Sequence, residues 1–433
     1  MRRRVGPGAG HVSPAARGAR DARGHHAGQA LSALRAAALL ALAVAAPGCA
    51  GSSVALGPAP VRTVEVALVA AFSGPDGSTG SMVRNSLELQ ARAIDDAGGL
   101  LGARVEIVAA DGAGDPARAA ELVRQQVGGA GVGLVVGPDT SAALQAARAT
   151  LDRAGVPNCL TAVSDAALRG ARTTFLAGAA NAAEVAALLD GLRRAAPDAR
   201  RIGLLDGRDD LGRSYDSLLA ARAPGAGLTY VGHATAGAAA GAGGGADQRA
   251  ALQHLTAQGA QVVVLSQTPA GAAGAAHAAA QLDAGRPLLA GFASAADYGF
   301  PGAGGDAAVG AVVAATPQAY LTSAPQAGWP AGYRAFVNAA GQQYGLGAEG
   351  SQLQAAPAGA DCLLQWARAV QAAGTFAGAA VARAWERVDL PASATALGVR
   401  ERSTAGDHAT VGRDGLLTYT WVREGSRYRL KPV

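Results

Sequence analysis

A strand, a turn and a helix start follow one another at residues 133–148, GLVVGPDTSAALQAAR, with the hydroxyl residues Thr140 and Ser141 at the start of the helix. Parallel-sheet proteins bind ligands at the carboxyl ends of their strands. A helix that starts there offers unpaired backbone N–H groups and the positive end of its dipole to an anion. Either hydroxyl could instead be an ordinary N-cap. The stretch is therefore a candidate anion site, with a simple helix cap as the alternative.

The rest of the chain offers little for catalysis or metal binding. The Gly-rich stretch 129–133 precedes a strand instead of following one, which is the wrong context for a dinucleotide fingerprint. Asp206, Asp209 and Asp210 follow a strand and could suggest a cation site, but a solvated loop is the more common explanation. No nucleophile, base and oxyanion donors come together. We therefore expect no enzyme, no catalytic residues, no cofactor and no metal.

The first 48 residues have the features of a secretory signal. Seven arginines and one acid precede an apolar run, AAALLALAVAA (36–46), which is too short to span a bilayer. Beyond residue 48 the chain is near neutral, with 30 basic and 31 acidic residues, so the formal net charge of +5 belongs to the leader. We therefore expect an exported protein and no nucleic-acid partner.

Cys49 directly follows Gly48 and resembles the lipidated cysteine of a bacterial lipobox, although Ala46 and Pro47 depart from the usual pattern. This resemblance implies a lipoprotein signal peptide over 1–48 and a tether over 49–61. The protein would then be anchored to the outer face of the cytoplasmic membrane through lipid alone. Two further cysteines lie far apart in the sequence. They could pair in an oxidising compartment, but we expect buried free thiols. They are Cys159 and Cys362.

From residue 62 onward, short apolar runs alternate with amphipathic segments. VEVALVA (64–70) has the continuous apolar pattern of a buried parallel strand, and 181–195 has branched residues at helical spacing. The alternation runs twice, which predicts two doubly wound α/β lobes with right-handed crossovers. The expected strands are 64–70, 104–111, 133–137, 157–162, 173–178, 200–207, 228–234, 261–267, 286–292 and 308–317, with a terminal hairpin at 415–432. The expected helices are 81–97, 116–127, 141–154, 181–195, 212–222, 248–258, 270–284, 331–344, 358–373 and 378–387, and 236–245 is expected to be a loop.

The order of these segments resembles the leucine/isoleucine/valine-binding family of type I periplasmic binding proteins, the solute receptors of ABC importers. The segments that carry the resemblance are 66–80, 93–119, 133–143, 155–168, 202–214 and 413–425. The most specific is AIDDAGGLLG followed by the acidic segment that ends at Asp115-Pro116.

The resemblance implies two Rossmann-like lobes with parallel sheets, joined by a hinge of three crossovers. Lobe I would hold 62–179 and 317–397, and lobe II would hold 181–315 and 399–433. The crossovers are expected near Gly178–Asn181, Ala315–Pro317 and Gly398–Arg400.

The same resemblance implies a ligand site between the lobes. An α-carboxylate would be held by Ser141, by the backbone at Ala162 and by Ser164. On the other side of the site this sequence departs from the family. Asn181 stands where an acid would meet the ligand ammonium, and the three expected aromatics are replaced. Their positions are Thr79, Leu211 and Gln267.

A buried ammonium without a carboxylate partner costs several kcal/mol. The ligand could therefore lack an amine, or could meet other acids such as Asp76, Asp139 or Asp165. A third alternative is that tight binding has been lost. We expect a monomeric solute-binding protein that delivers a small polar or carboxylated solute to an ABC permease. A ligand-sensing or partner-binding module of the same fold is the alternative.

Overall fold

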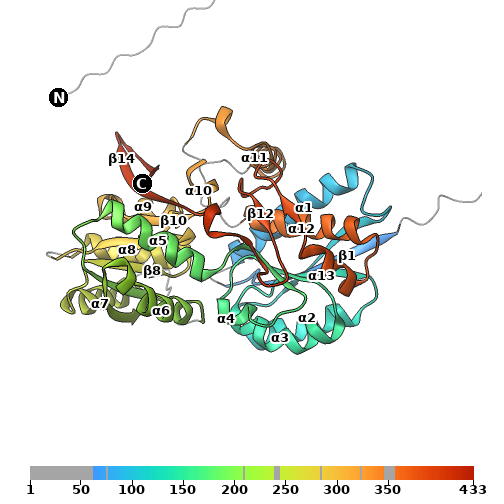
Figure 1. Cartoon of the computed structure of the whole chain (residues 1–433), viewed down its shortest axis with the longest axis horizontal. Helices are drawn as coiled ribbons and strands as arrows, with labels where there is room; N and C mark the ends of the chain where they lie inside the picture. The colour runs from blue at the N-terminus through green and yellow to red at the C-terminus, as the bar shows by residue number, and fades with distance from the viewer. Residues whose placement is uncertain are drawn as a thin grey trace, which may run out of the picture. The chain divides into compact units, whose positions relative to one another are not determined.

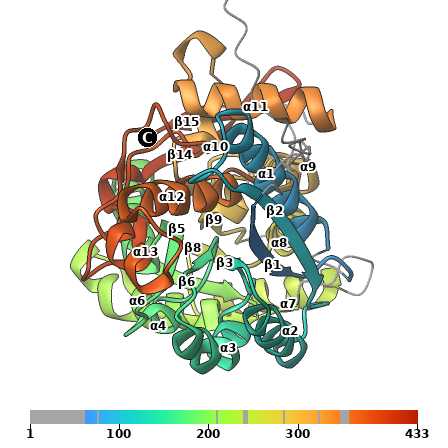
Figure 2. The ribbon, with the colours of Figure 1, turned by 90° about the vertical axis from the view of Figure 1, so that its right-hand side faces the viewer.

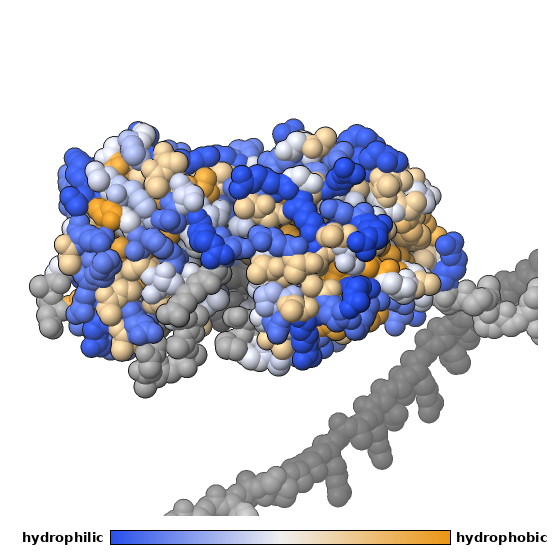
Figure 3. Space-filling model, turned by 90° about the horizontal axis from the view of Figure 1, so that it is seen from below, coloured by the Kyte–Doolittle hydropathy of each residue, from blue (hydrophilic) through white to orange (hydrophobic). Residues whose placement is uncertain are grey.

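The computed structural model describes residues 62–74, 77–207, 210–237, 244–282, 285–321, 324–345 and 356–433. The signal peptide, the tether and Cys49 lie outside these ranges, as do Asp76, Asp209 and most of the predicted loop at 236–245. No helix within the described ranges is long and apolar enough to cross a membrane. The face shown in Figure 3 mixes hydrophilic and hydrophobic residues and presents no single apolar belt.

The first of the two main sheets has six parallel strands in the order β13-β5-β4-β3-β1-β2. Val66 and Leu68 of β1 face one hydrophobic core, and Ala67 and Val69 face another on the opposite side of the sheet. Burial on both faces explains the continuous apolar pattern. The strands are β1 (Thr63–Ala70), β2 (Arg104–Asp111), β3 (Val132–Val136), β4 (Asn158–Leu160), β5 (Thr174–Ala179) and β13 (Ala409–Val411).

Helices cover both faces of this sheet (Figures 1 and 2). Residues of α1 and α12 line one core, and residues of α2 and α3 line the other. Helix α12 belongs to the C-terminal third of the chain, so the first lobe is completed by a segment that follows most of the second lobe in the sequence. The helices are α1 (Gly77–Asp96), α2 (Pro116–Gly128), α3 (Ser141–Ala154), α4 (Asp165–Leu168), α11 (Ala331–Tyr344), α12 (Ala356–Ala373) and α13 (Gly378–Trp385).

The second sheet has the order β15-β14-β10-β9-β8-β6-β7. The five strands from β6 to β10 are parallel to one another. The predicted terminal hairpin, β14 and β15, extends the sheet in the antiparallel sense through the pairing of β10 with β14. The strands are β6 (Arg201–Asp206), β7 (Thr229–Thr235), β8 (Val262–Ser266), β9 (Leu288–Gly291), β10 (Val312–Ala315), β14 (Leu417–Glu424) and β15 (Arg427–Pro432). The helices are α5 (Asn181–Ala195), α6 (Asp210–Arg222), α7 (Gly244–Ala257), α8 (Pro269–Ala280), α9 (Gly299–Gly304) and α10 (Gln318–Leu321). The two α/β lobes agree with the predicted fold class.

The third crossover differs from its predicted place. Strand β13 pairs with β5 of the first sheet, and β14 pairs with β10 of the second. The chain therefore passes between the sheets at 412–416 and not near Gly398–Arg400. The segment before it forms a small antiparallel pair of β11 (Asp389–Leu390) and β12 (Glu401–Arg402). Strands of two or three residues are too short to show a pattern, which explains the error.

The two cysteines of the described chain are bonded, so the expectation of free thiols is wrong. Cys159 of β4 and Cys362 of α12 form a disulfide with a Cα–Cα distance of 5.8 Å. Both residues are fully buried. The pairing depends on α12 returning to the first lobe 203 residues later, a placement that the spacing of the cysteines does not reveal.

Replacing both Cys159 and Cys362 by alanine should lower the free energy of unfolding by about 2–5 kcal/mol, because the bond restricts the unfolded chain across a long separation. Urea unfolding followed by circular dichroism measures the change. Reduced wild type is the control and should lie close to the variant. Equal midpoints for the oxidised wild type and the variant would show that the bond adds no stability.

Candidate functional site

Two carboxylates at the carboxyl end of the first sheet hold the loop that follows β1. Asp139 accepts a hydrogen bond from the Ala71 amide at 2.8 Å. Asp111 accepts from the Phe72 amide at 2.9 Å and from the Ser73 hydroxyl at 2.7 Å. These hydrogen bonds lower the pKa of Asp111 to about 2. Asp139, an alternative ligand acid from the sequence, is thus engaged with backbone.

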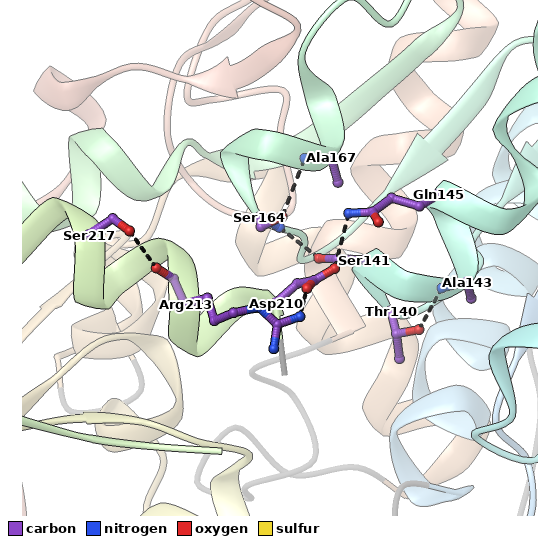
Figure 4. A network of polar contacts seen from close by, with 9 residues as sticks. All are labelled: Thr140, Ser141, Ala143, Gln145, Ser164, Ala167, Asp210, Arg213 and Ser217. Atoms are coloured by element: carbon purple, nitrogen blue, oxygen red, sulfur yellow. Dashed lines mark hydrogen bonds and ion pairs between the residues drawn. The ribbon is translucent and has the colours of Figure 1, made fainter. Parts of the chain in front are cut away.

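The hydroxyl residues at the start of α3 have separate roles (Figure 4). Thr140 is the N-cap of the helix, and its hydroxyl accepts from the Ala143 amide at 3.2 Å. Ser141 is the buried first residue of the helix, and its Oγ accepts from the Ser164 amide at 2.9 Å. Ser164 in turn caps α4 through the Ala167 amide at 3.3 Å. Each serine oxygen acts here as an acceptor, so each hydroxyl hydrogen can still be donated to an anion.

The other two candidate residues of the first lobe lie at the same edge of the sheet, one in a loop and one in a helix. Ala162 is exposed between β4 and α4, and Thr79 is half-buried in the first turn of α1. With Ser141 and Ser164, they follow the carboxyl ends of β1, β3 and β4. The first-lobe half of the predicted site is therefore gathered along one edge.

A contact between the lobes lies beside Ser141. The Gln145 side-chain amide of α3 donates to Asp210 of α6 at 3.0 Å, and Asp210 also forms an ion pair with Arg213 (Figure 4). Gln145 stands one turn after Ser141, on the same face of α3. From the sequence we expected Asp210 in a solvated loop, and this contact among Gln145, Asp210 and Arg213 was not predicted. One feature of the sequence could have indicated this contact. Asp210 starts a helix directly after β6, as Ser141 starts a helix after β3 of the first lobe.

Two of the candidates from the second lobe lie against its interior. Leu211 is half-buried and packs against the core that α5 and α6 share. Gln267 is buried, and its amide nitrogen donates to the Ala236 carbonyl at 3.3 Å. Its Oε1 has no hydrogen-bond partner among the described residues. Neither side chain is joined to Ser141 or Ser164 by the contacts of the described chain.

Asn181 is held by several hydrogen bonds within the protein. It is buried, and its Oδ1 accepts from the Asp165 amide at 3.1 Å and from the Ser214 hydroxyl at 2.9 Å. Its Nδ2 lies 3.3 Å from Glu184 and 3.3 Å from the Tyr215 hydroxyl. These bonds use the capacity of the amide. Asn181 therefore has a structural role in the described chain, and its contact with a ligand stays a prediction.

Asp165 is also engaged. Its carboxylate accepts from the amides of Asn181 at 2.7 Å and Ala182 at 3.0 Å. It therefore caps the first turn of α5 and joins α4 of the first lobe to α5 of the second across the first crossover. The positive end of the α5 dipole favours a carboxylate at this place.

Glu184 completes this cluster. Burial raises the pKa of Glu184 to about 7, and the negative charge of Asp165 adds to the rise. Hydrogen bonds from Tyr215 and Asn181 oppose it. Tyr215 also stacks on Phe292 with ring centroids 4.1 Å apart. The cluster ties α5 to α6, and its carboxylates are engaged within it.

A groove of about 390 Å³ lies at another place, beside the edge strand β2. It includes Thr63 and Arg104, the first residues of their strands, so it is at the amino ends of the strands and away from the candidate site. Its charges are partly compensated by an ion pair between Arg104 and Asp95. We do not assign a ligand to it.

Asn181→Ala should lower the free energy of unfolding by about 1–3 kcal/mol, because it removes the partners of buried polar groups. Ligand affinity should change by less than about threefold, which corresponds to less than 1 kcal/mol. Urea unfolding and calorimetric titration measure the two quantities. A large loss of affinity with unchanged stability would restore the original ligand-contact prediction.

The comparisons with known proteins agree with this geometry. The family model described as periplasmic binding protein matches residues 63–418. A Leu/Ile/Val-binding protein of Rhizobium johnstonii is 33% identical over 90 residues, which is 21% of this chain and 24% of that protein. The match thus spans about a quarter of the length of this curated relative.

Two solved structures are similar over nearly the whole described chain. A type 1 periplasmic binding protein from Bordetella pertussis has a TM-score of 0.72 at 19% identity, covering 86% of this chain and 100% of that one. A solute-binding protein of an R. palustris ABC transporter, in complex with 4-hydroxybenzoate, has a TM-score of 0.72 at 13% identity, covering 86% and 96%.

Two lobes of this topology, with hydroxyl groups at the carboxyl ends of the strands, define a type I periplasmic binding protein fold. The chain belongs to the periplasmic binding protein family.

Proposed function

We propose that this protein is the extracytoplasmic solute-binding component of an ABC importer. It binds one small carboxylated solute between its lobes as a monomer and delivers it to a membrane permease. The observation that carries the proposal is the pairing of Ser141 with Ser164 at 2.9 Å, which holds two hydroxyl donors beside the start of α3. Two hydroxyl hydrogens and a helix start suit a carboxylate.

The proposed contacts on the first lobe are Ser141, Ser164 and the backbone at Ala162, with Thr79 at the rim. The ligands named for the R. johnstonii and R. palustris relatives, branched-chain amino acids and 4-hydroxybenzoate, all carry a carboxylate. This common group fits the first-lobe donors.

The acidic and amide side chains around the candidate site favour a solute without an amine. Asp139 and Asp165 are engaged with backbone amides, and Asn181 is neutral and satisfied. Asp210 faces α3 but already has Gln145 and Arg213 as partners. An ammonium would have to share the Asp210 carboxylate with Gln145 and with the positively charged Arg213, at a cost that a carboxylic acid without an amine avoids. A solute of the 4-hydroxybenzoate kind is therefore preferred over isoleucine.

A thermal-shift screen of the mature protein with 4-hydroxybenzoate, benzoate, isoleucine and leucine tests this order, followed by calorimetric titration. Ser141→Ala should weaken binding of the best ligand roughly 10- to 150-fold, because a hydrogen bond to a charged group is worth about 1.5–3 kcal/mol. The adjacent Thr140→Ala is the matched control. It should cost about 1 kcal/mol of stability as a lost N-cap and leave affinity unchanged.

Equal affinities in the two variants would remove Ser141 from the site. Tighter binding of isoleucine than of 4-hydroxybenzoate would contradict the amine-free ligand and point to Asp210 as the partner of the ammonium. Binding of none of the four compounds would contradict the proposed ligand class.

We further propose that the protein is exported and held on the outer face of the cytoplasmic membrane by lipid on Cys49. The Cys159–Cys362 disulfide supports an oxidising compartment, and membership of a periplasmic family supports export. The lipid itself rests on the sequence pattern before Cys49.

Metabolic labelling with a palmitate analogue should mark the wild type and not Cys49→Ala, and the variant should leave the membrane fraction. Cys159→Ala is the matched cysteine control and should label like the wild type. Equal labelling of wild type and Cys49→Ala would remove the anchor from the proposal.

A further inference from the structure

Two carboxyl groups are buried together in the first lobe. Asp361 of α12 is 1% exposed and Glu401 of β12 is 0% exposed. The two side chains are within hydrogen-bonding reach of each other. Within the described chain no arginine or lysine pairs with either one. A pair of buried carboxyl groups this close cannot hold two negative charges.

The surroundings distinguish the two groups. Asp361 accepts from two backbone amides, those of Ala396 and Leu397, each at 2.7 Å. Two N–H donors stabilise the ionised form. Asp361 is therefore the better anion of the pair, and the turn at 395–398 is bound to α12 through it.

Glu401 has a different environment. Its Oε2 accepts from the side-chain amide of Gln365 and from the Thr410 hydroxyl, the latter at 3.1 Å. Its Oε1 is buried and has no donor among the described residues. Trp385 donates to the Gln365 oxygen at 3.0 Å, which fixes the amide so that its nitrogen faces Glu401. Oε1 is thus the oxygen of Glu401 that is left for a proton shared by the two carboxyl groups.

This pair is connected to the crossovers between the lobes. Thr410 belongs to β13, the last strand before the third crossover at 412–416. Its hydroxyl also accepts from the amide of Gly178 at 3.2 Å, and Gly178 lies in β5 just before the first crossover. Glu401 and Thr410 therefore link the ends of two strands from which the chain enters the second lobe.

We propose that one proton shared between Asp361 and Glu401 stabilises the packing of the first and third crossovers against each other. Loss of this proton at alkaline pH would destabilise that packing. The lobes would then move apart more readily at high pH than at low pH. This device depends only on buried groups of the first lobe and goes beyond the proposed solute-binding function.

Other charged groups on the adjoining elements are exposed or have partners other than the two buried carboxyls. On β12 and the residue before it, Arg402 is exposed and Arg400 pairs with Asp389 of β11. Beside β13 and α13, His408 and Glu386 lie 3.6 Å apart. None of these five groups forms a hydrogen bond or an ion pair with the buried carboxyls within the described chain.

The direction of the pH effect follows from the position of the proton. Burial and the negative charge of Asp361 hold the pKa of Glu401 well above its ordinary value of 4.5. In the opened state, in which the crossover segments separate locally and Glu401 meets water, this proton is released more easily. The proton therefore stabilises the folded state most when the pH is below the ordinary pKa of a glutamate. This stabilisation decreases as pH rises towards the raised pKa and is lost beyond it. Between the ordinary and the raised pKa, the equilibrium constant for local opening of the crossover segments rises by about tenfold per pH unit.

Glu401→Gln is the decisive variant, because a glutamine reproduces the protonated acid. Its oxygen can accept from Gln365 and Thr410, and its nitrogen can donate to Asp361 without titrating. Asp361→Asn is the matched control. It removes the same charge but turns an NH₂ group towards the amide of Ala396 or Leu397.

Hydrogen exchange of the segments 174–182 and 395–411 is measured from pH 6 to 9 and corrected for intrinsic exchange rates, together with urea midpoints. Protection in the wild type should fall as pH rises, by up to about tenfold per pH unit relative to Glu401→Gln, whose protection should stay level. Asp361→Asn should lose protection at every pH. The proposal would be overturned if protection depended on pH in the same way in the wild type and in Glu401→Gln. It would also be overturned if Glu401→Gln and Asp361→Asn changed protection and the urea midpoint equally.

Discussion

The first lobe cannot be completed without the C-terminal third of the chain, and the rest of the structure depends on this constraint. A parallel sheet must be covered on both faces. One face here is covered partly by α12, whose Cys362, Leu363 and Trp366 are buried against the strands. Strand β13 then adds a further strand at the edge beyond β5. The chain must therefore cross between the lobes three times, and this brings the crossovers side by side.

The candidate site follows from the direction of the strands. Parallel strands end at one edge, so the loops after β1, β3 and β4 meet there, and Ser141 can hold the amide of Ser164. The carboxylates of the same region are used inside the protein. Asp111 and Asp139 hold the loop after β1, and Asp165 caps α5. What is left to a ligand is a set of hydroxyl donors, and this is the basis on which we propose a carboxylated solute without an amine.

The crossovers are held by polar groups that are buried among apolar ones. Asp165 and Asn181 join α4 to α5 at the first crossover, and the carboxyl pair of Asp361 and Glu401 is connected to the third through Thr410. Buried polar groups of this kind fix a geometry because each lost partner leaves an unsatisfied atom. They also make the geometry dependent on protonation.

The sequence by itself determined the two-lobe α/β class and the edge at which the site lies, because buried parallel strands and amphipathic helices have patterns that a chain shows locally. It also placed Ser141 and Ser164 correctly after their strands. Only the tertiary structure decided which acids are engaged, that Asn181 is satisfied and that Cys159 meets Cys362. It also decided that the third crossover lies at 412–416. Each of these depends on contacts between segments far apart in the chain, where the identity of the partner and not the local pattern sets the role of a residue.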